Sequence, residues 1–206
     1  MPKRGRRKRR SELKELLMLL YLKSYGPIGR YRLKDMLGLS EFEGVVKLML
    51  SDLRKEGYIS TSKVGSKLTA KGEKLLTQRL KACNIVDVKD FDPLDLKTGP
   101  VTVGIQIRGK ADEIRFGIDE RDAAVRAGAQ GATVLAFKDG ALRFPPILED
   151  LSSKYPELAA KILETYSLVD GDVIIFVSAE NRWRALEGAL AVALSLHQFS
   201  FMKGAV

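Results

Sequence analysis

The residues of this sequence best suited to chemistry are its clustered lysines and arginines. The chain of 206 residues carries a formal net charge of +9, and that charge is unevenly distributed. Residues 1–83 hold 21 Lys and Arg against 8 Asp and Glu, whereas residues 84–206 hold 14 against 18. Because Lys and Arg pair with backbone phosphates, the first part of the chain is the part expected to bind a polyanion.

The N-terminal arm, residues 1–10, has the densest positive charge. Its sequence, MPKRGRRKRR, offers no apolar anchor, and like-charge runs of this kind are typical of interaction arms that stay disordered until they meet a partner. The alternative is a tail that only increases solubility. The residues of the arm expected to contact phosphate are Arg4, Arg6, Arg7, Arg9 and Arg10.

Catalytic and metal chemistry have little support in the composition. One cysteine, Cys83, and one histidine, His197, are too few for a disulfide framework or a Cys/His zinc site. No Ser, Cys or Asp stands at a telling spacing from His197, and GxxxxGK(S/T), GxGxxG after a strand and HExxH are absent. We therefore expect no enzyme, no catalytic residues, no metal and no cofactor.

Chain length and hydropathy limit the classes of protein to which this sequence can belong. No stretch approaches the roughly twenty consecutive apolar residues of a membrane helix, and the first ten residues lack the apolar core of a secretory signal. We expect a cytoplasmic, nucleoid-associated protein with no membrane partner. With 45% apolar residues, two domains of about 100 residues can each form a core.

The first element expected to position the cations is a helix that begins after Ser11 and ends at the break Gly26-Pro27. Its leucines recur at helical spacing, but further apolar residues such as Met18 and Leu19 give it more apolar surface than one small domain covers. A second helix or a partner subunit is expected to pack there. Residues 28–31 are short enough to be a bridging strand, and a brief second helix follows.

A capping box marks the third helix. Ser40 is followed three residues later by Glu43, the spacing at which the two side chains cap each other's backbone N–H groups. Gly57 ends this helix, and two helices joined by so short a turn are typical of a helix-turn-helix. Residues 58–68 then predict a β-hairpin around a polar loop, and Thr69 caps a fourth helix.

This order of elements, with the phrases RLKDMLGLS, LRKEGYIS and KLTAKGEKLL, resembles the winged helix-turn-helix regulators common in archaea and bacteria. The resemblance covers residues 11–83 and implies a domain that binds double-stranded DNA, with the hairpin as its wing. Bases should be read by the outward face of the third helix. Besides the arm, the residues expected to contact DNA are Arg30, Tyr31 and Arg32 before the second helix, Gly44, Lys47 and Ser51 on the third, with Leu48 as a further candidate, and Lys63, Ser66 and Lys67 in the wing.

Two carboxylates argue against strong sequence-specific recognition of DNA bases by the third helix. Glu41 and Glu43 stand at the front of the third helix, where a negative charge near phosphate is unfavourable. Capping and the helix dipole explain both residues. We therefore expect modest specificity from this helix, with the arm and the wing holding the duplex.

The remainder of the chain predicts a second domain. Residues 84–99 are rich in aspartate and lack periodicity, so we interpret them as a linker. In residues 100–206, a helix capped by Asp119, the hairpin signal Asp139-Gly140 and the β-forming run 172–177 belong to an order β-α-β-β-α-β-α. That order predicts a ferredoxin-like sheet plus a terminal helix, and thus a two-domain α+β fold.

The second domain resembles the sensing and dimerising domains of leucine-responsive and ACT-type regulators, and also the α/β domain that follows winged helices in some archaeal regulators. We therefore predict a transcriptional regulator, a homodimer whose second domain senses a small-molecule effector, sets subunit spacing, or both. Asp119–Asp122, with Arg108 or Arg115, is a candidate lining for a polar ligand. The alternative is a non-specific architectural nucleic-acid-binding protein without an effector.

Overall fold

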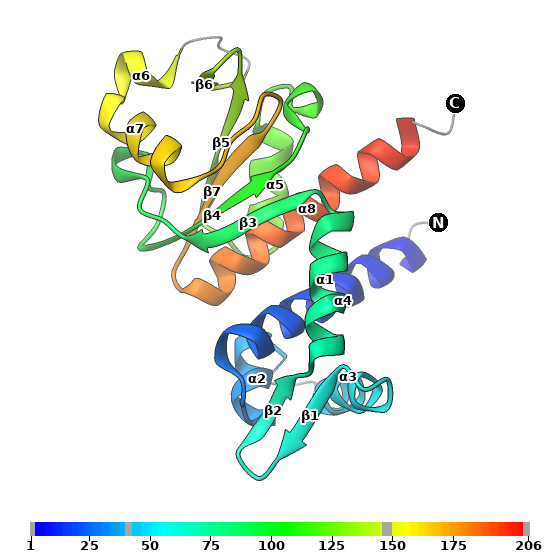
Figure 1. The fold of residues 1–206 in the computed structure, drawn as a ribbon. Coiled ribbons are helices and arrows are strands. Elements are labelled where there is room, and N and C mark those ends of the chain that lie inside the picture. The colour runs from blue at the N-terminus through cyan, green and yellow to red at the C-terminus, as the bar shows by residue number, and fades with distance from the viewer. Residues whose placement is uncertain (1–2, 40–42, 146–149, 204–206) are drawn as a thin grey trace. The chain divides into compact units, whose positions relative to one another are not determined.

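The computed structural model describes residues 3–39, 43–145 and 150–203, with side chains for 12–39, 43–145 and 150–197. The chain divides into two units, Met1–Leu80 and Lys81–Val206. The first consists of helices and one hairpin, and the second is built on a larger sheet (Figure 1). The prediction of a two-domain α+β fold is confirmed.

The first unit follows the predicted order of helices and hairpin. Its elements are α1 (Lys3–Tyr25), α2 (Arg30–Met36), α3 (Glu43–Lys55), β1 (Ile59–Ser62), β2 (Gly65–Leu68) and α4 (Ala70–Ala82). α3 ends where Gly57 adopts a φ of +75° and Tyr58 N donates to Leu53 O at 2.8 Å. α4 begins after Thr69, whose Oγ1 accepts a hydrogen bond from Gly72 N at 3.1 Å. Both helix boundaries were predicted correctly.

The start of the chain differs from the prediction. α1 begins at Lys3 and not at Ser11, so the backbone of residues 3–10, predicted to be disordered, continues the leucine-rich helix. Lys and Arg are good helix formers, and extending a helix that already exists adds one hydrogen bond for each residue fixed. The side chains of the arm and the capping residue Ser40 lie outside the described residues.

The second unit is a five-stranded antiparallel sheet between two layers of helices. Its elements are β3 (Ile85–Asp90), β4 (Val101–Ile107), α5 (Ile118–Arg126), β5 (Gly131–Lys138), β6 (Ala141–Arg143), α6 (Leu151–Lys154), α7 (Pro156–Thr165), β7 (Val173–Ala179) and α8 (Arg182–Lys203), with single 3₁₀ turns at Leu94–Leu96 and Ala111–Glu113. The strand order is β3-β4-β7-β5-β6. α5 and α8 cover one face, and α6 and α7 cover the other (Figure 1).

Residues 84–99 do not form the predicted linker. β3 pairs with β4 from Ile85 opposite Ile107 to Asp90 opposite Val103, so this segment belongs to the second unit. The strand was not predicted because the aspartates of this segment are typical of loops. β3 lies at the edge of the sheet, where charged side chains are common because they discourage pairing with other chains.

The order β-α-β-β-α-β-α is observed in residues 100–206, but the strands are not placed as in a ferredoxin-like sheet. β4 and β5 run parallel with one antiparallel strand between them, and that strand is β7 instead of β6. β6 has three residues and ends before Pro145, whereas β7 is buried at all seven positions. A fully buried apolar strand needs neighbours on both sides, so β7 takes the central place, as its composition predicted.

An aromatic cluster fills the core between the sheet and α7. The ring centroids of Phe91 and Phe176 lie 4.7 Å apart, and those of Phe91 and Tyr166 lie 5.6 Å apart. A Cβ at Gly104 in β4 would collide with Tyr166 Oη and lie 3.1 Å from Phe176 Cε1. Tyr166 Oη is buried and has no hydrogen-bond partner among the described residues, and this burial raises the pKa of Tyr166.

We predict that Gly104→Ala lowers the free energy of unfolding by about 1–3 kcal/mol, because the added methyl group overpacks this cluster. Tyr166→Phe, which removes only the hydroxyl without a partner, should change stability much less. The double variant should recover part of the loss, since the hydroxyl is the nearest obstacle. Urea unfolding of the three variants tests the packing, and a Gly104→Ala protein as stable as the wild type would contradict it.

Candidate nucleic-acid interface

A groove of about 470 Å³ lies between α3, the start of α2 and the β1–β2 hairpin. Its described lining residues include four cations and no carboxylate, together with several hydroxyl groups. Cationic and hydroxyl side chains are the groups that proteins use to contact phosphate and sugar. The lining residues are Gly29, Arg30, Tyr31, Lys47, Leu50, Ser51, Arg54, Thr61, Ser62, Lys63, Val64, Gly65 and Ser66.

Two backbone hydrogen bonds join the walls of the groove. Ile28 N donates to Ser66 O and Ser66 N donates to Ile28 O, each at 2.9 Å. The predicted bridging strand is therefore a single antiparallel bridge, which attaches the segment before α2 to the hairpin. Ile28 is itself buried, so the bridge is fixed to the core of the unit. As a result, the first residues of α2 lie beside the loop of the hairpin.

The first turn of α2 contributes a cation and an aromatic ring. Arg30, Tyr31 and Arg32 were predicted to precede the second helix, but α2 begins at Arg30. Tyr31 is 62% exposed, and the Arg30 guanidinium carbon and Lys34 Nζ lie 5.0 and 5.5 Å from its ring centroid. Arg30 Nη2 also lies 2.9 Å from Glu43 Oε1, so Glu43 holds one of the cations of the groove.

α3 turns one side toward the groove. Val46 and Leu53 are buried in the unit, whereas Lys47, Ser51 and Arg54 line the groove one helical turn apart. Sequence reasoning missed Arg54. Its spacing from Lys47 and Ser51, seven and three residues, was the signal that would have placed it on this side of the helix.

Of the predicted contact residues outside the arm, six line this groove. Those it contains are Arg30, Tyr31, Lys47, Ser51, Lys63 and Ser66. Arg32, Gly44 and Lys67 are exposed but do not line it. Ser66 is only 6% exposed, and its Oγ lies 3.2 Å from Thr61 Oγ1. Ser66 therefore fixes the hairpin and does not offer its hydroxyl to a ligand.

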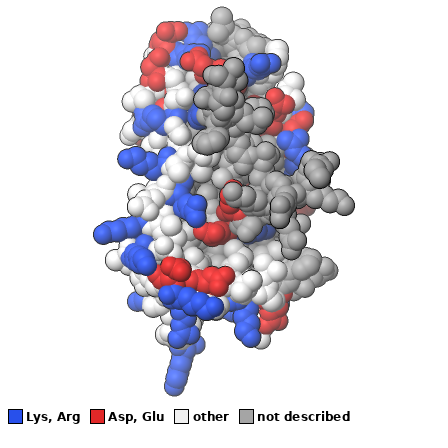
Figure 2. All heavy atoms as spheres, turned by 90° about the vertical axis from the view of Figure 1, so that its right-hand side faces the viewer, with Lys and Arg blue, Asp and Glu red and all other residues white. Residues whose placement is uncertain are grey.

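Of the four cations of the groove, only Arg30 is held in an ion pair among the described residues. Elsewhere, Lys23 pairs with Glu73 and Arg79 approaches Glu15. Within the described residues, Lys47, Arg54 and Lys63 have no ion-pair partner. In Figure 2, Lys and Arg side chains project from the lower part of the face shown, which belongs to the first unit. The groove thus has positive charge available for an anionic partner.

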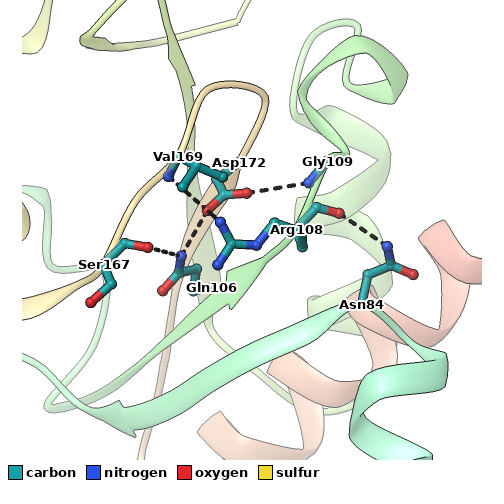
Figure 3. A network of polar contacts seen from close by, with 7 residues as sticks. All are labelled: Asn84, Gln106, Arg108, Gly109, Ser167, Val169 and Asp172. Atoms are coloured by element: carbon teal, nitrogen blue, oxygen red, sulfur yellow. Dashed lines mark hydrogen bonds and ion pairs between the residues drawn. The ribbon is translucent and has the colours of Figure 1, made fainter.

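A buried carboxylate of the second unit has its acceptor positions filled (Figure 3). Asp172 Oδ2 accepts from Gln106 Nε2 at 2.7 Å and from Val169 N at 3.2 Å, and lies 3.2 Å from Arg108 Nη1. Asp172 Oδ1 accepts from Gly109 N at 3.3 Å. The network ties the end of β4 to the loop before β7. We interpret it as a support for the fold, because a ligand would have to displace several donors.

The polar ligand site predicted around Asp119–Asp122 is not assembled in the structure. Arg108 pairs with Asp172, and Arg121 pairs with Asp122 at 2.9 Å. Asp119 is not the helix cap, because Gly117 holds that position with a φ of +72°. Glu120 is buried, and its burial raises the pKa of its carboxyl group.

Comparisons with known proteins support the α+β fold of the chain. Residues 98–196 match the family described as Domain of unknown function (DUF4443). No curated protein matches the chain. Among solved structures, the chain is similar to "Hypothetical protein PH0730 from Pyrococcus horikoshii OT3", with 28% sequence identity and a TM-score of 0.68 over 91% of this chain and 93% of that one. None of the described helices has the length and hydropathy of a membrane span.

The bridge between Ile28 and Ser66 leads us to predict different effects of substitution at two glycines. A Cβ at Gly65, where φ is +139°, would lie closer than 3.0 Å to three backbone atoms of Ile28, whereas a Cβ at Gly29 would meet nothing within 4 Å. Gly65→Ala should therefore lower the free energy of unfolding of the first unit by about 1–3 kcal/mol, and Gly29→Ala should leave it nearly unchanged.

Hydrogen exchange of the Ile28 and Ser66 amides, together with thermal unfolding, measures both effects. Faster exchange at these two amides is expected in Gly65→Ala alone. Equal behaviour of the two variants would show that the bridge does not constrain the hairpin.

Proposed function

We propose that this protein is a DNA-binding transcriptional regulator whose first unit is a winged helix-turn-helix domain. The observation that carries the proposal is the groove, which is lined from both α3 and the hairpin by cations that have no ion pair among the described residues. Lys47 and Arg54 come from one wall and Lys63 from another, with hydroxyls of Ser51 and Ser62 between them. A sugar-phosphate strand matches this arrangement because it is anionic and accepts hydrogen bonds along its length.

In the proposed complex, α3 lies in the major groove and the hairpin contacts the adjacent backbone. The major groove of B-DNA, about 12 Å wide, admits one α-helix. One strand then occupies the groove between α3 and the hairpin, within reach of Lys47 and Lys63. Tyr31 and Arg30, at the first turn of α2, meet the next phosphate along that strand, as helix N-termini commonly do.

The second unit, in this proposal, senses a small-molecule effector or sets the spacing of two subunits. The apolar residues of α1 that favoured a homodimer, including Met18, Leu19 and Leu22, are buried in the single chain. The apolar core of α8, including Leu190 and Val192, is buried as well. A homodimer would therefore have to form through other surfaces.

We predict that Lys63→Gln and Lys47→Gln each weaken binding to a random-sequence duplex of about 20 base pairs, because each leaves one backbone phosphate without its cation. The slope of log affinity against log salt should become shallower by about 0.9 for each phosphate that is no longer neutralised. Lys74→Gln, at an exposed position of α4 away from the groove, is the matched control and should leave affinity and slope unchanged. Fluorescence anisotropy at several salt concentrations measures both quantities. Equal slopes in all three variants would contradict the proposed interface.

Glu43 should have the opposite effect. Its carboxylate lies beside Arg30 and would approach a phosphate of the bound strand. Glu43→Gln removes that repulsion and releases Arg30, so we predict affinity to rise by roughly two- to fivefold, in the range of a single exposed charge interaction. The same anisotropy titration tests this, and weaker binding by Glu43→Gln would place the duplex elsewhere.

A non-specific architectural protein would share every phosphate contact and differ only in base reading. Recovery of bound fragments from genomic DNA separates the two functions. A shared sequence motif is expected for a regulator, whereas uniform coverage would favour the architectural alternative.

A further inference from the structure

The outward side of α3 exposes apolar side chains between polar ones. Leu48 is 61% exposed and Val45 is 46% exposed, on a helix whose buried residues are Val46 and Leu53. At 100° for each residue, Leu48 and Ser51 lie almost opposite the buried stripe, with Lys47 on the side of the groove. Gly44, one turn before Leu48, would have nothing within 4 Å of an added Cβ, so the helix surface there is flat and open.

These residue types determine how α3 can read bases. Asn and Gln, which read adenine through paired hydrogen bonds, are absent from α3, and its one arginine, Arg54, lies in the last turn on the side of the groove. The hydrogen-bonding side chains on or beside the outward side include Lys47, Ser51 and Lys55. Ser contacts several bases, so it discriminates weakly. An apolar side chain at the floor of the major groove recognises one group that only thymine carries, the 5-methyl group.

We propose that Leu48, with Val45 beside it, contacts thymine 5-methyl groups and is the main determinant of sequence preference in α3. This inference rests on the proposed DNA-binding function. It gives the protein a preference for sites with thymine at the positions that face Leu48, a selection made by apolar contact and not by hydrogen bonds.

Charge complementarity identifies DNA as the occupant of this surface in preference to an apolar protein partner. Leu48 is next to Lys47, and the groove beyond it carries Arg54 and Lys63 without ion-pair partners among the described residues. A protein partner would have to cover these charges along with the leucine. A duplex satisfies both requirements, because its phosphates meet the cations while its thymine methyl groups meet Leu48.

Replacement of thymine by deoxyuridine provides the test, since it removes the methyl group and keeps every hydrogen-bonding edge. The full-length protein first selects duplexes of about 20 base pairs from a randomised pool, and the best of these is then made with thymine or with deoxyuridine. We expect the wild type to bind the uracil duplex roughly fourfold more weakly for each methyl group in contact. Leu48→Ala should reduce the ratio of thymine to uracil affinity, with Val45 and the alanine methyl group keeping part of the contact, and should bind the thymine duplex more weakly than the wild type does.

Leu163→Ala is the matched control, because Leu163 is 49% exposed but lies in α7 of the second unit, outside the groove. It should keep the wild-type ratio of thymine to uracil affinity. Equal binding of the two duplexes by the wild type, or an unchanged ratio in Leu48→Ala, would overturn this inference and leave DNA binding intact. Absence of binding to any duplex at low salt would overturn the proposed function itself. Because Leu48 is exposed, thermal unfolding of Leu48→Ala should match that of the wild type.

Discussion

The pair of backbone hydrogen bonds between Ile28 and Ser66 is the constraint on which the groove depends. It attaches the hairpin to the segment that leads into α2, and it places Arg30 and Tyr31 beside Lys63. Gly65 permits the close approach, because any Cβ there would collide with the backbone of Ile28. Side chains from α2, α3 and the hairpin therefore line one groove.

The helix boundaries and the buried strand that were predicted correctly from the sequence depend on residues close together in the chain. Gly57 and Thr69 end and begin helices through their own backbone and hydroxyl geometry, and the run around Ile174 and Phe176 shows by composition alone that it is buried on both faces. The features it missed depend on distant partners. β3 is defined by its pairing with β4, and β6, which has only three residues, lies at the edge of the sheet instead of between β4 and β5.

The same distinction applies to the candidate site. Residue type and approximate position identified Lys47, Ser51 and Lys63, which line the groove, because helix periodicity and hairpin signals are local. The burial of Ser66 was not predicted, because its contacts with Thr61 and Ile28 are not revealed by any local pattern. The partnership of Arg30 with Glu43 was also missed, since a capping box already explained Glu43 in the sequence. In the proposed complex, phosphate binding and base reading therefore use adjacent sides of α3, with cations on one side and Leu48 on the other.

The central claim is that a DNA duplex occupies the groove between α2, α3 and the hairpin. Amide chemical-shift mapping of the isotope-labelled full-length protein, titrated with duplex DNA, tests it most directly. The account predicts that the largest shifts occur at residues 29–31, 44–51 and 61–66, while the amides of the central strand β7 stay unchanged. Shifts confined to the second unit, with the amides of the groove unaffected, would contradict it.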